Sequence, residues 1–241
     1  MAISNVLCAL TGKTGSGKSY CLHYLLRREI QMKRREGIVI LDLQGDHWGL
    51  KDESNEFYGF PISEDIFLTK KIDWAGVLKK YPYIIISPKA GFDGEQYGAL
   101  SDEIAGAIME IGNRTFVIEE AQFAMPVKSS LQHNLAALIT TGRKLGIDLY
   151  FTTQRPAFVS TTAIAQANTR ITFLVDDVND LKRLQPYFPG SDLTKLQRFH
   201  FAATNNFNHA TLVGDNNHLS KIDEIVWPRG IMENNEKGKQ S

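Results

Sequence analysis

The residues of this 241-residue chain with the clearest chemistry form a glycine-rich segment, residues 12–19, of sequence GKTGSGKS. It matches the pattern G-x-x-x-x-G-K-[ST] at every fixed position, which predicts a loop whose backbone N–H groups hold nucleotide phosphates. Lys18 can reach the β- and γ-phosphates, and the Ser19 hydroxyl can bind Mg²⁺. The alternative is a glycine-rich turn without a chemical role. The expected nucleotide contacts are Gly12, Lys13, Thr14, Gly15, Ser16, Gly17, Lys18, Ser19 and Tyr20.

The surroundings of this segment favour the phosphate loop over a simple turn. An apolar run, residues 6–10, precedes it and indicates a strand. Leucines at 22, 25 and 26 and an isoleucine at 30 follow it with the spacing of a helix face. The positive end of that helix would point at the phosphates, because helix N-termini carry free N–H groups.

A second pair of candidate residues, Glu119 and Glu120, follows the mostly apolar run 115–118. Acids at the tip of a buried strand are costly unless a cation or donor faces them. We expect Glu119 to hold Mg²⁺ through water, and Glu120 to polarise the water that attacks the γ-phosphate. Aspartate is the usual first acid, so Glu119 is a departure. The alternative is a strand that ends in solvated glutamates.

The composition of the chain narrows the kinds of function that it can have. Hydrophobic residues make up 43% of the chain, charged residues 22%, and the formal net charge is zero. This argues against coating of nucleic acid through bulk charge, but leaves room for a local basic surface. Two cysteines, Cys8 and Cys21, indicate packing positions, and the six histidines lack ligand spacing, so no zinc site is expected. The sequence has neither an apolar run of membrane-spanning length nor the features of a signal peptide, so we expect a cytoplasmic protein.

The hydrophobic patterns predict an α/β protein with a mainly parallel central sheet flanked by helices, ending in a β-hairpin. Residues 1–228 would form one domain, and the polar residues 229–241 a disordered tail. The expected strands are 6–10, 37–42, 83–87, 115–120, 147–153 and 170–175, with a hairpin of 199–203 and 209–213. Besides the helix after the phosphate loop, the expected helices are 74–80, 95–111, one opening at Pro126, and 178–187.

Together with the phosphate loop, the segments EEAQ (119–122), TGRKLGI (141–147) and TQRP (153–156) resemble the HerA/FtsK superfamily of ring-forming, DNA-pumping ATPases. The resemblance covers roughly residues 6–175 and implies a RecA-like P-loop NTPase fold of the ASCE type. It further implies that Gln154 senses the γ-phosphate and that Arg143 is a finger reaching the neighbouring subunit's nucleotide. Arg170 is a second candidate for phosphate contact.

Each of these three residues also has a plainer explanation. Arg143 follows a helix, whose C-terminal dipole favours a cation. Gln154 could simply be a polar residue at a strand end, and Arg170 an ordinary salt-bridge partner. On the functional reading, a guanidinium supplied by the next subunit would stabilise the transferring phosphoryl group and make hydrolysis depend on assembly.

The resemblance implies an ATP- and Mg²⁺-dependent DNA translocase, acting on double-stranded DNA as a homo-oligomeric ring, a hexamer or pentamer. Since the phosphate loop begins at residue 12, the chain resembles the stand-alone motors that package viral genomes, with a capsid as partner and the host cytoplasm or virion as location. One alternative is a DNA-repair or DNA-transfer motor with a nuclease partner. Another is a slow-turnover ATP-dependent switch or assembly adaptor.

The sequence gives only weak candidates for DNA contact. They are Lys13, Lys128 and the basic run 33–35. A charged run at a helix end is more often solvated surface, so no DNA site is assigned to these residues. Contacts to phosphates would supply affinity without sequence preference.

Overall fold

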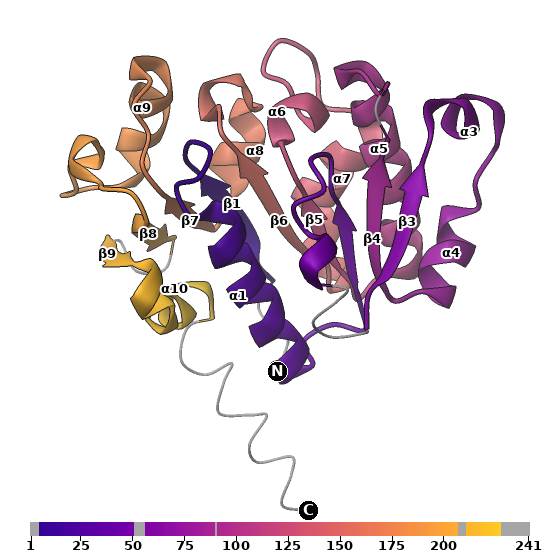
Figure 1. The fold of residues 1–241 in the computed structure, drawn as a ribbon, viewed down its shortest axis with the longest axis horizontal. Helices are drawn as coiled ribbons and strands as arrows, with labels where there is room; N and C mark the ends of the chain where they lie inside the picture. Colours follow the sequence, from indigo (N-terminus) through magenta and orange to yellow (C-terminus); the bar gives the residue numbers. More distant parts are fainter. Residues whose placement is uncertain (1–4, 51–55, 90, 207–210, 228–241) are drawn as a thin grey trace, which may run out of the picture.

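The computed structural model describes residues 5–50, 56–89, 91–206 and 211–227, which build one sheet covered on both faces (Figure 1). The sheet has nine strands in the order β3-β4-β2-β5-β6-β1-β7-β8-β9. The pairings from β3 to β7 are parallel, and β8 and β9 extend the sheet in antiparallel fashion. The strands are β1 (Leu7–Thr11), β2 (Ile38–Leu41), β3 (Tyr58–Ile62), β4 (Tyr83–Pro88), β5 (Thr115–Ile118), β6 (Asp148–Thr153), β7 (Thr169–Thr172), β8 (His200–Asn205) and β9 (Leu212–Asp215).

Helices cover the two faces of this sheet. They are α1 (Lys18–Met32), α3 (Glu64–Thr69), α4 (Trp74–Lys80), α5 (Gly94–Ile111), α6 (Ala121–Ala124), α7 (His133–Thr141), α8 (Thr161–Gln166), α9 (Val178–Leu184) and α10 (Asp223–Val226). Short 3₁₀ turns complete them: η1 (Gly142–Leu145), η2 (Pro156–Phe158), η3 (Gln185–Tyr187), η4 (Leu193–Lys195) and η5 (Asn216–Ile222). None of the helices in the described ranges is both long and apolar enough to cross a membrane.

Strand β2 at the centre of the parallel sheet is apolar throughout because both of its faces are buried. In β2, Val39 and Leu41 pack in the core beneath α4, α5 and α7, whereas Ile38 and Ile40 pack in the core beneath α1 and α10. The two free cysteines, at 8 and 21, lie buried in the second of these cores, as expected of packing residues.

Most predicted elements are confirmed within two or three residues, including the C-terminal hairpin of β8 and β9. Residues 209 and 210 of that hairpin prediction, and the predicted tail 229–241, lie outside the described residues. The helix predicted to open at Pro126 is present, but its predicted start is wrong, because it begins only at His133. Pro126 instead forms an isolated antiparallel bridge with Val159, and the next residue, Val127, donates its N–H to the carbonyl of Phe158.

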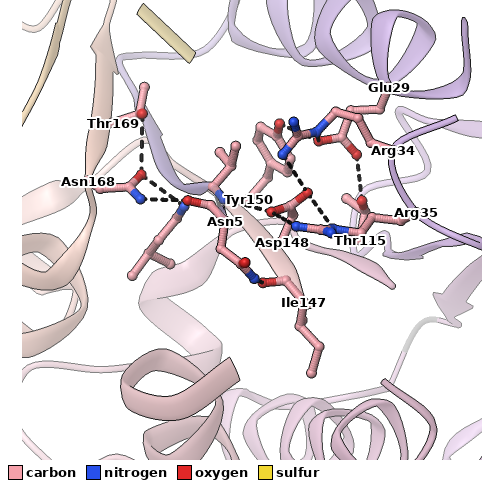
Figure 2. Close-up of polar contacts among 12 residues, drawn as sticks. Asn5, Glu29, Arg34, Arg35, Thr115, Ile147, Asp148, Tyr150, Asn168 and Thr169 are labelled. Carbon is pink, nitrogen blue, oxygen red and sulfur yellow. Dashed lines mark hydrogen bonds and ion pairs between the residues drawn. The ribbon is translucent and has the colours of Figure 1, made fainter. Parts of the chain in front are cut away.

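A buried charge cluster ties α1 to the amino edge of the sheet (Figure 2). Asp148, fully buried at the start of β6, accepts two hydrogen bonds of 2.8 Å from Arg35 and one of 3.2 Å from Arg34. Its Oδ1 also accepts from the N–H of Val6 at 2.6 Å. Two members of the basic run considered for DNA contact therefore hold the fold together.

Glu29 completes this cluster from α1. Its carboxylate accepts hydrogen bonds from the hydroxyls of Thr115 and Tyr150, and it lies 3.7 Å from the Nε of Arg34. Burial raises the pKa of Glu29 to about 7, helped by the charge of Asp148 and opposed by Arg34. The amino ends of β5 and β6 are thus joined to α1 by groups without access to solvent.

Candidate nucleotide-binding site

The loop between β1 and α1 has the backbone of a phosphate cradle. Gly12, Gly15 and Gly17 have φ angles of 138°, 67° and 117°, a region that glycine enters without steric cost. A side chain at Gly12 would bring its Cβ to 2.8 Å from the Cβ of Phe173, so packing as well as φ requires glycine there. Helix α1 follows at once, and its N-terminal N–H groups face the loop.

Lys18 lies at the start of α1, almost fully buried. Its ammonium donates a 3.1 Å hydrogen bond to the carbonyl of Lys13 inside the loop. Burial lowers the pKa of Lys18, while the charges of Glu120, Glu119 and Asp46 work in the opposite direction. The predicted phosphate loop and the predicted pair of acids therefore meet in one site.

The order of the strands in the sheet explains why the phosphate loop and the two acids lie close together. Strand β6 lies between β1 and β5, and the three run parallel, so that their carboxyl ends reach the same edge. That edge is where ligands bind in open parallel sheets. The phosphate loop leaves β1 there, Gln154 directly follows β6, and Glu119 and Glu120 directly follow β5.

Three glutamine amides hold the carboxylate of Glu120. Gln44 and Gln154 donate to its Oε1 at 2.9 and 2.5 Å, and Gln122 donates to its Oε2 at 2.5 Å. The Thr14 hydroxyl in the phosphate loop is hydrogen-bonded to the side-chain oxygen of Gln154. A continuous chain of contacts thus runs from the loop through Gln154 to Glu120. Glu120 has a left-handed backbone, with φ of 50°, at the turn from β5 into α6.

Glu119 faces a different set of partners. Its Oε1 lies 3.1 Å from Nε2 of His47, and His47 Nδ1 lies 2.8 Å from Nε2 of His23 on α1. Asp42, at the end of β2, accepts hydrogen bonds from the backbone N–H groups of residues 45, 46 and 47 and so shapes this loop. Burial raises the pKa of Glu119 to about 7, and His47 opposes the rise.

The donor chemistry fits a hard divalent cation. Potential ligand atoms of Asp42, His47 and Glu119 all lie within 4.8 Å of one another. The two carboxylates are oxygen donors of the kind that Mg²⁺ prefers, and the hydroxyl of Ser19 belongs to the first turn of α1. Spacing along the sequence did not reveal this group, because loop 42–47 and β5 meet only in the folded sheet.

The two predicted arginines lie away from this edge. Arg143 belongs to η1, before the amino end of β6, and its exposed side chain makes no ion pair within the described ranges. Arg170 is not a phosphate contact of this chain's own site. Its buried guanidinium donates to the carbonyls of Ile164 and Ala165 at the end of α8 and stacks 4.3 Å over the ring of Tyr187.

Several residues of the site were not predicted from the sequence. Gln44 and Gln122, which hold Glu120, and His47, which holds Glu119, were given no role, although Gln44 and His47 lie in the polar loop after β2 and Gln122 lies within EEAQ. The exposed Tyr20 lies on the outer side of the first turn of α1, where the prediction of a nucleotide contact stays a prediction.

Comparisons with known proteins agree with this arrangement. Residues 6–89, from β1 through β4, match the family model described as Helicase HerA, central domain. The genome packaging NTPase B204 from Sulfolobus turreted icosahedral virus 2, in complex with ATP-gammaS, has a TM-score of 0.66 and 17% identity. The match covers 89% of this chain and 98% of that chain. VirB4 of Thermoanaerobacter pseudethanolicus has a TM-score of 0.65 and 12% identity, over 88% of this chain and 89% of that chain.

None of the curated proteins matches this chain. At these identities the structural likeness shows the fold, which is that of the RecA-like P-loop ATPases, as predicted. The match of residues 6–89 to the HerA central domain supports the resemblance to the HerA/FtsK superfamily that the motifs indicated.

Proposed function

We propose that the protein is an ATP-hydrolysing DNA translocase that works as a homo-oligomeric ring and packages a viral genome. The observation that carries the ATPase part is the chain of contacts from Thr14 through Gln154 to Glu120. It joins the phosphate loop to a carboxylate that can act on water. The packaging part rests on the similarity to B204, which is a genome packaging NTPase.

In this proposal the phosphate loop and Lys18 bind the triphosphate, and Ser19 and Glu119 hold Mg²⁺. The metal ion, when bound, would neutralise charge on the phosphate oxygens. Glu120 accepts a proton from the attacking water. A carboxylate has about four lone-pair positions, and three amides occupy three of them, so one remains for that water.

Turnover and binding measurements test the proposal. Lys18→Ala should abolish ATP binding or hydrolysis, and double-stranded DNA should stimulate the wild-type ATPase. Native mass with and without ATP and DNA should show assembly into a ring. A monomer whose ATPase ignores DNA would refute the translocase. A slow-turnover switch differs in that Glu120→Gln would leave its turnover unchanged.

A further inference from the structure

The phosphate loop has a second neighbour, on the side away from Glu120. Strands β5 and β6 lie on one side of β1, whereas β7, β8 and β9 lie on the other (Figure 1). The segment before β8 reaches back to the loop. Arg198 donates from Nε to the carbonyl of Gly15 at 3.1 Å, and Phe199 donates its N–H to the carbonyl of Ser16 at 3.1 Å.

The backbone around Phe199, which meets the phosphate loop, has an unusual conformation. Phe199 has a φ of 65°, an uncommon value for a residue with a side chain. Its carbonyl accepts a hydrogen bond of 2.9 Å from the N–H of Asn216, whose side chain packs against Gly17. Three successive loop residues, 15, 16 and 17, therefore touch the antiparallel extension of the sheet.

The guanidinium of Arg198 is exposed and fixed at only one of its donors. Nε is engaged by Gly15, and the group stacks at 4.7 Å over the ring of Phe199. Within the described ranges no carboxylate pairs with it. Its Nη2 would lie 3.7 Å from a Cβ placed on Gly15, so it stands directly beside the loop. A planar fork with free N–H groups is well suited to bind phosphate oxygens.

We infer that Arg198 binds the nucleotide from the same subunit, at the phosphates that ATP and ADP share. Glu120 and Gln154 mark the β5–β6 side as the place where the terminal phosphate is cleaved. A triphosphate is a linear chain, so the phosphates nearer the sugar extend toward the opposite, β8 side, where Arg198 stands. This inference rests on the proposed nucleotide site and adds a residue to it.

The test measures binding of ADP and of a non-hydrolysable ATP analogue by calorimetry. Arg198→Gln should weaken both by about 10-fold or more, since hydrogen bonds to charged groups are worth more than neutral ones. Arg198→Lys, which keeps the charge without the fork, should retain part of the affinity. Lys195→Gln is the matched control, because this exposed lysine, three residues earlier, pairs with Asp192 at 3.2 Å and should leave binding unchanged.

Two measurements distinguish a direct contact between Arg198 and the nucleotide from an indirect role in holding the phosphate loop. The melting temperature of unliganded Arg198→Gln should match that of the wild type, and the phosphorus NMR signals of saturating bound ADP should shift. Unchanged affinity for both nucleotides would overturn the inference, as would a loss confined to the ATP analogue or a large fall in unliganded stability. A wild-type protein that binds neither nucleotide would refute the proposed function itself.

Discussion

Replacing Arg143 with alanine tests whether the active site is shared between two subunits. Arg143 precedes β6 and Gln154 follows it, and a strand of this length spans about 17–20 Å. The guanidinium thus lies at the opposite edge of the sheet from the phosphate loop of its own chain. If Arg143 is a finger, it can act only on a neighbouring copy.

Arg143→Ala should therefore lower turnover by about 10³–10⁵-fold, the range for arginines that stabilise a transferring phosphoryl group. Affinity for ATP should not change, because the residues that bind phosphate remain in place. Lys144→Ala is the matched control, since this exposed neighbour in η1 carries the same charge and should leave turnover unchanged.

Mixing two inactive variants gives the decisive measurement. Arg143→Ala keeps the base but lacks the finger, and Glu120→Gln keeps the finger but lacks the base. In an equimolar, randomly assembled ring, about one quarter of the interfaces join an intact base to an intact finger. Steady-state ATPase should thus recover to about one quarter of the wild-type rate. No recovery on mixing, or near-normal turnover of Arg143→Ala alone, would refute the shared site.

Three further predictions concern the base and the buried charge cluster. Glu120→Gln should reduce turnover by about 10²–10⁴-fold while ATP stays bound, as rapid filtration of bound nucleotide would show. Asp148→Asn should cost about 3–5 kcal/mol of unfolding free energy in denaturant titrations, because it leaves buried arginines unpaired, whereas Asp192→Asn at an exposed pair should cost less than about 1 kcal/mol. The pKa of Glu29 rises from 4.5 to about 7 on folding, so its stabilising contribution is present below pH 4.5 and is lost as the pH rises toward about 7. Glu29→Gln should flatten the pH dependence of the melting temperature across that window.

The sequence predicted the fold well where one segment's pattern decides its structure. Parallel strands buried on both faces read as continuous apolar runs, so 38–41 and 115–118 were recognisable alone. The phosphate loop was equally legible, since its glycines are required by local φ angles. Pro126 misled the prediction because proline often opens a helix, whereas here the distant Val159 fixes its segment in an extended bridge.

The residues that the sequence missed depend on partners far along the chain. Arg198 meets Gly15 across 183 positions, and Gln44 meets Glu120 across 76. No periodicity or motif encodes such a pair, because strand order alone decides which loops share an edge. Arg170 is the opposite case, a residue that the sequence predicted for the site and that the structure places elsewhere. It belongs to a segment that resembles a phosphate-binding one, but the end of α8 and Tyr187 occupy its guanidinium. A motif identifies the chemistry a residue could do, and the packing around its side chain decides whether that chemistry is available.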